Sequence, residues 1–296
     1  MIVITTPTGD IGSQVLRLLL DQDEEVRVIV RDPAKLSDDI RDRVDVVAGS
    51  HGDAAVVDRA FDGADAVFWL PPPDPRAVSL EAAFSGFTKP AADAFVARGI
   101  GHVVGVSALG RGTAVADRAG LVSASLAMDD VIAASGVAYR ALANPSFMDN
   151  LLRQVDAIRD NGVFVDTVIA DRKAPSAATR DIAAVAATLL TDRSWTGVDS
   201  VAVLGPEDIS ADDMAAIMSD VLGSPIRYVR VSHDDLGARM RSFGWSDAEA
   251  DGMVDMMRAK DDGLDAGVIR TPENSTPTTF RQWCQEVLEP AIRGAK

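Results

Sequence analysis

The stretch "MIVITTPTGDIGSQVLRLLL" at residues 1–20 decides how the rest of the chain is interpreted. Its first five residues are apolar and mostly β-branched, which predicts a short buried strand, and residues 13–20 carry leucines at helical spacing. In the turn between them, Gly9 permits close backbone approach to a ligand and Gly12 permits close helix packing. The N–H groups and positive helix end of such a unit favour a bound pyrophosphate, with an ordinary turn that binds nothing as the alternative.

Thr6 stands where the usual fingerprint of a dinucleotide-binding turn has its first glycine. A threonine is tolerable there if its backbone stays in the β region and its hydroxyl faces away from the cofactor or caps the turn. We therefore expect an extended conformation at Thr6.

Composition limits the classes of function. The chain has 296 residues, 47% of them hydrophobic and 25% charged, which suits one large α/β domain or a domain with a smaller companion. It has no window apolar enough for a membrane span and no basic signal region before the first strand, so we expect a cytoplasmic protein without a membrane partner. A net charge of -16 repels phosphates and predicts no direct nucleic-acid binding.

The cysteine and the histidines give no sign of a metal or nucleophile site. Cys284, the single cysteine, falls in an apparent amphipathic helix and is interpreted as a buried structural thiol. His51, His102 and His233 are far apart in the sequence and lack metal-ligand spacing, so we predict no metal.

Apolar strands alternate with helical segments through the first half of the chain. The further strands are expected within residues 25–32, 44–50, 64–73, 102–109 and 137–145. This alternation predicts an α/β fold with a doubly wound parallel sheet covered on both faces. A ligand would lie at the carboxyl ends of the strands, where Thr6, Arg31, Pro71, Ser107 and Asn144 fall.

The second half reads as a smaller, mainly helical lobe. We expect residues 1–145 with about 181–205 to form a Rossmann domain, and about 146–180 with 206–296 to form a substrate-side lobe. Ser210 and Thr279 are plausible N-caps, and Gly223 is a plausible helix stop. The Met-rich helix at residues 246–263 is typical of core or of a pocket wall.

The end of the second strand bears on the choice of dinucleotide. An acidic residue there would accept hydrogen bonds from the ribose of NAD, whereas an arginine pairs with the 2′-phosphate of NADP. The chain has Arg31, followed by Lys35 one turn later, which favours NADP(H) over NAD(H). Asp32 either serves a ribose or caps the next turn, and a solvated surface arginine is the alternative for Arg31.

Taken together, these motifs resemble those of the NmrA-like family of atypical short-chain dehydrogenase/reductase proteins. "TPTGDIG" (6–12) and "VRDPAKL" (30–36) stand where the family has "GATGxxG" and "VRDPAK". "ADAVFWLPPPDP" (64–75), "VVGVSALGRG" (103–112) and "YRALANPSFMDNL" (139–151) follow in the family's order, and the likeness covers essentially the whole chain. The resemblance implies a Rossmann domain that binds NAD(P)(H), with a small C-terminal lobe forming a cleft over the nicotinamide end.

The resemblance also implies residue roles. Ser50 stands where relatives have an aspartate that contacts adenine, which puts that contact in doubt. Ser107 would approach the nicotinamide, and Asn144, Pro145, Ser146 and Phe147 would form the floor between nicotinamide and substrate. The expected cofactor contacts are Thr6, Thr8, Gly9, Asp10, Ile11, Gly12, Arg31, Lys35, Ser50, Pro71, Pro72, Ser107, Asn144, Pro145 and Phe147.

Catalytic groups are harder to find. Typical short-chain dehydrogenases carry a Tyr-xxx-Lys pair on the helix after the fifth strand, and residues 121–135 contain neither residue type. Asp129 matches an acid of the family, but Ser125 replaces its basic partner. We take Ser107, or a water held by it, as the group that polarises an acceptor, and Asp129 as the second catalytic candidate. Tyr139 and Tyr228 fall in predicted strands and are interpreted as packed aromatics. Apolar walls are expected from Trp69, Phe147, Met148 and either Met253 or Met256.

Two main functions follow. The first is hydride transfer from NADPH to a quinone- or enone-like small molecule that needs little acid assistance. The second is a non-catalytic NAD(P)(H)-sensing regulator that acts through a protein partner, and a weaker third is an isomerase or lyase that retains its cofactor. A homodimer is compatible with each of them.

Overall fold

The computed structural model describes residues 1–294, and their contacts divide them into two compact units. Unit 1 contains Met1–Ala108, Ala124–Ala143 and Ile182–Val201. Unit 2 contains Leu109–Ser123, Asn144–Asp181 and the residues from Ala202 onward. The short segment Leu109–Ser123 thus packs with the C-terminal residues rather than with the strand that precedes it.

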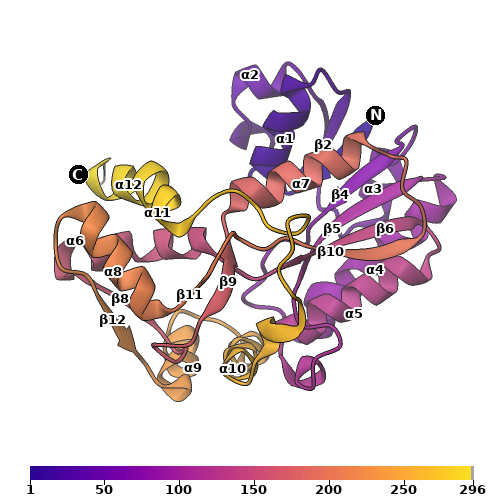
Figure 1. Ribbon diagram of the computed structural model, residues 1–296. Coiled ribbons are helices and arrows are strands. Elements are labelled where there is room, and N and C mark those ends of the chain that lie inside the picture. Colours follow the sequence, from indigo (N-terminus) through magenta and orange to yellow (C-terminus); the bar gives the residue numbers. More distant parts are fainter. Residues whose placement is uncertain (295–296) are drawn as a thin grey trace. The chain divides into compact units, whose positions relative to one another are not determined.

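Unit 1 is built on a seven-stranded sheet within the described residues, in the order β10-β6-β5-β4-β1-β2-β3 (Figure 1). Its strands are β1 (Ile2–Thr5), β2 (Val26–Val30), β3 (Asp45–Ala48), β4 (Ala66–Trp69), β5 (His102–Ala108), β6 (Ala138–Asn144) and β10 (Val198–Ala202). The pairings of β1 with β2, β1 with β4, β2 with β3, and β4 with β5 are all parallel. Because the chain moves outward from β1 first to one side and then to the other, the predicted doubly wound α/β fold is confirmed.

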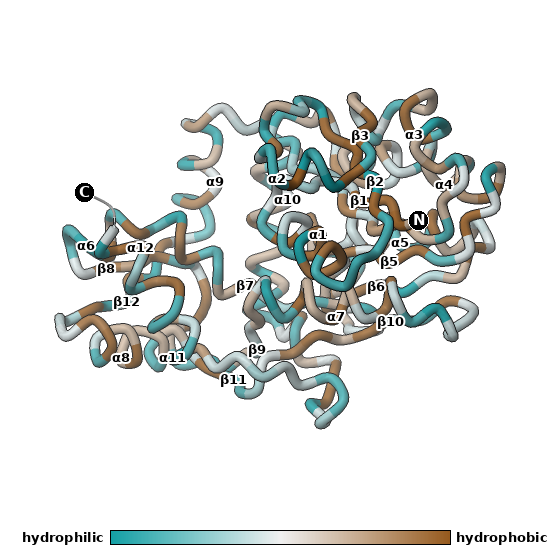
Figure 2. Tube along the Cα trace, turned by 90° about the horizontal axis from the view of Figure 1, so that it is seen from above, coloured by the Kyte–Doolittle hydropathy of each residue, from teal (hydrophilic) through white to brown (hydrophobic). Residues whose placement is uncertain are grey.

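Helices cover both faces of this sheet. They are α1 (Gly12–Asp21), α2 (Asp38–Arg41), α3 (Ala54–Ala60), α4 (Phe87–Ala97), α5 (Leu121–Ala134) and α7 (Thr179–Thr191), with the short turns η1 (Pro33–Lys35) and η2 (Ala82–Gly86). Figure 1 shows α1 and α7 on one side of the strands and α4 and α5 on the other. The central strands are mostly brown, that is apolar, in Figure 2, as expected of a sheet buried on both faces.

Successive residues of each central strand pack into the hydrophobic cores on the two faces of the sheet. Val3, Ile29 and Val67 belong to one cluster, together with buried side chains of α3, α4 and α5. Their neighbours Ile2 and Ile4 are fully buried as well but lie outside that cluster. The period of two along the strand therefore directs successive side chains to opposite faces, and both faces exclude water.

Unit 2 combines helices with two small sheets, in the orders β11-β9-β7 and β12-β8. Its strands are β7 (Ser146–Phe147), β8 (Val163–Asp166), β9 (Ala174–Ala177), β11 (Asp208–Ile209) and β12 (Arg227–Arg230). Its helices and helical turns are η3 (Ala116–Arg118), η4 (Met148–Gln154), α6 (Val155–Asn161), α8 (Ala211–Leu222), α9 (His233–Ser242), α10 (Asp247–Asp261), η5 (Leu264–Gly267), α11 (Phe280–Trp283), η6 (Cys284–Leu288) and α12 (Glu289–Gly294). No helix in residues 1–294 is sufficiently long and apolar to cross a membrane.

Several local predictions for this unit are confirmed. Ser210 caps α8 in a reciprocal capping box with Asp213, and Gly223 ends that helix in the left-handed conformation. Thr279 caps α11 by accepting from the backbone N–H of Gln282 at 3.1 Å. Cys284 is fully buried, and that burial raises the pKa of its thiol to about 12, which fits a structural role.

Helix α10 is held in place by a backbone contact at two glycines. Gly120 has a φ of +50°, and a Cβ atom built on it would lie 2.0 Å from the carbonyl oxygen of Gly252 in α10. Gly252 is itself buried within the helix. This close approach fixes the helix that carries Met253 and Met256.

We expect Gly120→Ala to lower the free energy of unfolding by at least about 2 kcal/mol more than Gly244→Ala. Both glycines have positive φ, but a Cβ atom at Gly244 would meet nothing within 4 Å, so the control carries only the conformational cost. Urea titrations of the two variants measure the difference, and equal losses would show that the contact with Gly252 is unimportant.

Candidate functional site

The carboxyl end of β1 is fastened to the end of β4 by one side chain. The hydroxyl of Thr5 donates to the carbonyl oxygen of Phe68 at 2.9 Å and accepts from the backbone N–H of Leu70 at 2.9 Å. Thr5 is fully buried, so these bonds are shielded from water. The turn that follows β1 therefore starts from a fixed point.

Thr6 does not have the extended conformation that we expected. Its φ is +48°, in the left-handed region that a β-branched residue rarely adopts. Its carbonyl oxygen accepts from the N–H of Gly9 at 3.0 Å, and its Oγ1 is buried without a hydrogen-bond partner among the described residues. The expectation was wrong because the tight turn imposes the backbone conformation of the fingerprint's first glycine on whatever residue stands there.

The amino end of α1 fits an anionic group. The N-cap residue, Ile11, makes no side-chain cap, and no acidic residue lies in the first turn of the helix. A Cβ atom at Gly12 would lie 2.2 Å from the carbonyl oxygen of Thr6, so only glycine lets the helix begin this close to the strand. Thr8 and Asp10 are exposed around this end, Gly9 is half-buried, and Ile11 is buried. A helix end without a side-chain cap offers its N–H groups and its positive dipole to a pyrophosphate.

Beyond the end of β2 lies an exposed cationic stretch. Arg31 and Lys35 are both exposed. Asp32 accepts from the N–H of Ala34 at 3.1 Å and so caps η1, which favours the capping alternative for this residue. Ser50, after β3, accepts from the N–H of Gly52 at 3.3 Å through its hydroxyl. Arg31 and Lys35 are thus in reach of solvent and of a phosphate there.

His51 lies in an aromatic cage that the sequence did not reveal. Its ring packs edge-on against Trp69 at 5.2 Å and Phe87 at 4.9 Å, measured between ring centroids. Its Nε2 lies 3.0 Å from the carbonyl oxygen of Leu70, which assigns a neutral ring with the proton on Nε2. Burial lowers the pKa of His51 to about 4, and the charge of Arg31 contributes in the same direction.

The two catalytic candidates bond to each other. The hydroxyl of Ser107, at the end of β5, donates to Oδ2 of Asp129 on α5 at 2.5 Å. The hydroxyl of Tyr139, on β6, donates to Oδ1 of the same carboxylate at 2.6 Å. A Cβ atom at Gly105 would lie 2.3 Å from that phenol oxygen, so the strand makes room for the ring. Tyr139 is packed in the core as expected, yet its hydroxyl also completes a buried polar cluster of Ser107, Asp129 and Tyr139.

The remaining predicted contacts are divided between the two units. Pro71 is buried and Pro72 half-buried after β4 in unit 1. Asn144 and Pro145 are buried in unit 2, and the carbonyl oxygen of Asn144 accepts from the N–H of Leu109 at 2.9 Å. Phe147 is half-buried on β7.

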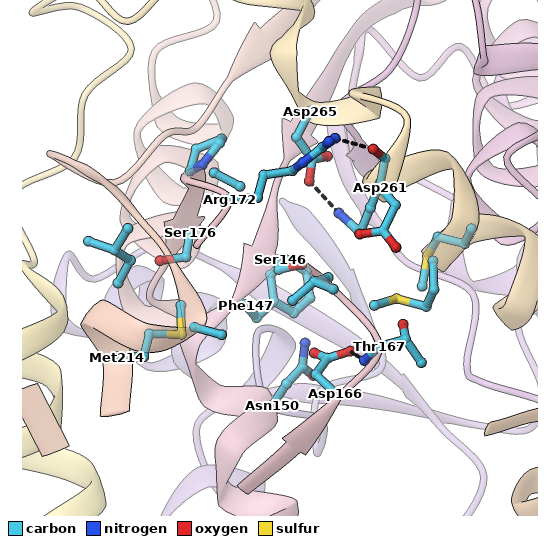
Figure 3. Close-up of a pocket in the computed structure, with 18 of the residues that line it drawn as sticks. Ser146, Phe147, Asn150, Asp166, Thr167, Arg172, Ser176, Met214, Asp261 and Asp265 are labelled. Carbon is cyan, nitrogen blue, oxygen red and sulfur yellow. Dashed lines mark hydrogen bonds and ion pairs between the residues drawn. The ribbon is translucent and has the colours of Figure 1, made fainter. Parts of the chain in front are cut away.

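Unit 2 encloses a cavity of about 840 Å³ (Figure 3). Phe147, Met148, Met253 and Met256 all line it, as expected of the apolar walls. Trp69 does not: it is fully buried in unit 1, with its Nε1 donating to Thr88 at 3.0 Å. The volume is in the range of pockets that hold small organic ligands.

Polar groups are interspersed with this apolar wall. Asp166 accepts from the N–H of Thr167 at 2.6 Å and is exposed in the cavity, but the protein that surrounds it raises the pKa of its carboxyl above the ordinary value. The hydroxyls of Thr167 and Ser176 are buried and have no hydrogen-bond partner among residues 1–294. Figure 3 shows Ser146, Phe147, Asn150 and Asp166 around the same space. The cavity therefore offers both apolar surface and unused hydrogen-bonding capacity.

A comparison of the sequence with known protein families matches residues 7–193 to the family described as NAD(P)H-binding. The chain belongs to the NAD(P)H-binding family. This agrees with the NmrA-like resemblance and confirms that the expected cofactor is a nicotinamide dinucleotide. The match begins at Pro7, directly after Thr6, and includes the turn, α1 and the end of β2.

The chain is also similar to curated proteins over nearly its whole length. It is 31% identical to a (4-alkanoyl-5-oxo-2,5-dihydrofuran-3-yl)methyl phosphate reductase of Streptomyces griseus, covering 98% of each chain. It is 29% identical to an NAD(P)H azoreductase of Xenophilus azovorans, covering 96% of each chain. Among solved structures, an NADPH-dependent quinone oxidoreductase of Escherichia coli in complex with NADPH matches with a TM-score of 0.76 and 24% identity, covering 95% of this chain and 98% of the other. That structural match shows a shared fold.

The features that sequence analysis missed come from residues far apart in the chain. His51 was considered only as a metal ligand, yet it directly follows Ser50 in the segment expected at the adenine. Asp166, Thr167 and Ser176 lie in short strands and loops without a motif. Asp166 and Thr167 directly follow the short apolar run of residues 163–165, a signal that the sequence analysis did not use.

Replacing Thr6 by glycine tests the strain in the turn. We expect Thr6→Gly to raise the free energy of unfolding by about 1 kcal/mol, because it removes a β-branched residue from positive φ and a buried hydroxyl without a partner. Asp23→Gly is the matched control: Asp23 also has a positive φ, of 57°, but aspartate tolerates it and the side chain is exposed. Thermal melts should show a gain for the first variant alone.

His51 makes unit 1 sensitive to acid. Its pKa is lower in the folded state than the ordinary value of 6.5, so the unfolded chain binds the proton more tightly. The stabilising contribution is complete above pH 6.5 and is lost as pH falls toward about 4. Between pH 7.5 and 5 the loss amounts to roughly 2 kcal/mol. We expect urea-unfolding free energies of His51→Gln to fall by correspondingly less over this interval, and parallel pH profiles would contradict the assignment.

Proposed function

We propose that this protein is an oxidoreductase that uses NADPH to reduce a small quinone- or enone-like molecule. The observation that carries the proposal is the amino end of α1, which lacks a side-chain cap and begins against Thr6, together with the exposed Arg31 at the end of β2. A pyrophosphate and a second phosphate are the two features by which NADPH is recognised in such a fold.

Different residues of unit 1 bind different parts of the cofactor. The N–H groups of residues 10–12 meet the pyrophosphate, while Arg31 and Lys35 meet the 2′-phosphate. Because Asp32 is already a cap for η1, it does not compete for a ribose, which favours NADPH over NADH. NADPH supplies the hydride when it is bound.

The named activities of the relatives support reduction of a conjugated acceptor. The Streptomyces griseus relative is a reductase of an unsaturated lactone, the Xenophilus azovorans relative is an azoreductase, and the Escherichia coli structure is that of a quinone oxidoreductase. Each of these names gives a substrate class with a conjugated double bond, C=C or N=N, to which hydride can add, and such an acceptor needs little acid assistance. This chain, with no Tyr-xxx-Lys pair in α5, fits the same requirement.

Ser107 is our candidate for the group that polarises the acceptor. In the polar cluster, its hydroxyl hydrogen is directed at Asp129, which holds the Ser107 oxygen in one orientation. When Ser107 gives its proton to a reduced acceptor, Asp129 would take the proton of Tyr139 at Oδ1 and return a proton to Ser107 from Oδ2, so that the proton lost from the cluster is that of Tyr139. Asp129 is then a catalytic partner of Ser107 rather than an isolated acid.

The cavity of unit 2 favours an enzyme over a sensor. A regulator that only reports the redox state of NADP(H) requires no second pocket, whereas an oxidoreductase must bind a second small molecule. The cavity has the size and the mixed lining of a small-molecule site, with Phe147, Met253 and Met256 suited to a flat ring.

The cofactor assignment is tested by binding. We expect the wild-type protein to bind NADPH more tightly than NADH, and Arg31→Asp to weaken NADPH by roughly tenfold or more while leaving NADH within about threefold. Arg59→Asp, an exposed arginine on α3, makes the same change of charge away from this site. Calorimetric titrations of the three proteins measure this, and an equal loss in both variants would refute the role of Arg31.

Turnover is tested with the same preparations. Oxidation of NADPH, followed by its absorbance, should accelerate with quinones or α,β-unsaturated ketones and should stop when the acceptor is omitted. Tight NADPH binding without turnover across such a panel would instead support the sensing role.

A further inference from the structure

The cavity of unit 2 is unusually rich in basic side chains for so acidic a chain. Six basic and five acidic residues line it, although the whole protein carries a net charge of -16. The basic residues are Arg153, Arg172, Lys173, Arg239, Lys260 and Arg270. A cavity wall with locally positive charge attracts and binds an anion even when the net charge of the protein is negative.

Most of the acids in the wall are already neutralised. Asp265 is paired with Lys260 at 2.6 Å, and Asp208 is paired with Arg270. Asp261 is paired with Arg230 at 2.8 Å and also accepts from the N–H of Ile169 at 3.0 Å. These pairs contribute little net charge to the cavity.

The two other acids, Asp166 and Asp235, add less negative charge to the cavity than two free carboxylates would. Asp166 has a raised pKa because protein surrounds its carboxyl, so its charged form is disfavoured. Asp235 accepts from the hydroxyl of Ser232 at 2.7 Å at the start of α9 and is exposed.

Three arginines in the wall have no carboxylate partner within the described part of the chain: Arg153, Arg172 and Arg239. Arg172 is the best placed of them. Its Nη1 donates to the backbone carbonyl oxygen of Asp261, which fixes the guanidinium at the cavity. Figure 3 shows it beside Asp261 and Asp265, above Ser146 and Phe147. A guanidinium that is anchored through one nitrogen is preorganised to bind a carboxylate, sulfonate or phosphate through its other N–H groups.

The apolar part of the wall suits a flat ring. Met214, Met253 and Met256 are all half-buried there, and their thioethers are polarizable and adaptable. Phe147 adds an aromatic face from β7. The same cavity therefore combines a surface for stacking with a fixed cation.

We propose that the molecule bound in this cavity is an aromatic or conjugated ring that carries an anionic group, and that Arg172 binds the anion. The inference rests on the proposed function, because it takes the ligand of this cavity to be the acceptor that is reduced. It adds the chemical class of that acceptor. Carboxylate, sulfonate and phosphate share the chemistry that Arg172 recognises.

The test uses three ligands on one ring that cannot themselves be reduced by NADPH. These are 2-naphthoate, its neutral isostere 2-naphthamide, and the cation 2-(aminomethyl)naphthalene. Calorimetry should show the anion binding at least tenfold more tightly than the amide, and the cation binding most weakly. Equal binding of the anion and the amide, or tighter binding of the cation, would overturn the proposal.

Substitutions of Arg172 test whether this residue binds the anion. Arg172→Gln should abolish the preference for the anion without weakening the amide, and Arg172→Lys should retain a reduced preference because it keeps the charge but loses the planar fork. Arg258→Gln is the control, because Arg258 lies on α10 outside the cavity lining and pairs with exposed Asp234 and Asp255. The same loss in Arg258→Gln as in Arg172→Gln would refute the role of Arg172. Thermal melts establish that each variant is folded.

Failure of this inference differs from failure of the proposed function. A protein that oxidises NADPH with quinones but does not distinguish naphthoate from naphthamide would keep its function and lose the anion site. A protein that binds naphthoate through Arg172 but never oxidises NADPH would keep the anion site and lose the function.

Discussion

The packing of α1 against the end of β1 is the constraint on which unit 1 depends. No side chain fits at Gly12, because a Cβ atom there would lie 2.2 Å from the carbonyl oxygen of Thr6. The helix can begin at this point only if the strand ends in a sharp turn, and that turn requires the left-handed conformation at residue 6. Thr5 fixes the start of the turn by bonding to the carbonyl oxygen of Phe68 on β4 and to the N–H of Leu70 just after that strand. The uncapped helix end proposed to bind an anion is thus a consequence of backbone packing rather than of particular polar side chains.

Thr6 shows how a site tolerates a locally unfavourable residue. Positive φ at a β-branched residue costs on the order of 1–2 kcal/mol, and its buried hydroxyl adds to that cost. The surrounding bonds at Thr5 and Gly9 over-determine the turn, so the backbone keeps the shape of a glycine turn with a different residue in it. The backbone shape of the turn is therefore preserved even though the sequence fingerprint is incomplete.

A feature could be predicted from the sequence when the residues that form it are close together in the chain. The doubly wound sheet was predictable because strand and helix periods are local, and so were the caps at Ser210 and Thr279, where one side chain reaches a nearby N–H. The conformation of Thr6 could not be predicted, because its φ is set by the packing of α1 against the end of β1. The bond from Tyr139 to Asp129 joins a strand to the preceding helix, and its existence depends on the space left by Gly105. Contacts of this kind have no signature in residue spacing.

The residues proposed to bind the phosphates of the cofactor and those that would select a substrate belong to different units. The groups expected to hold NADPH lie at the ends of β1 and β2 and are formed by unit 1 alone. The groups that would choose a substrate lie in unit 2, on segments as distant in sequence as Ser146 and Asp265, and only part of their charge is paired within the wall, Lys260 with Asp265 and Arg270 with Asp208. A family that keeps the first set and varies the second can change its acceptor without disturbing its cofactor. In this chain, Arg172 is the member of the second set whose proposed chemistry is most specific, because an ion pair within the wall contributes little to recognition, whereas a guanidinium without a carboxylate partner can select an anion.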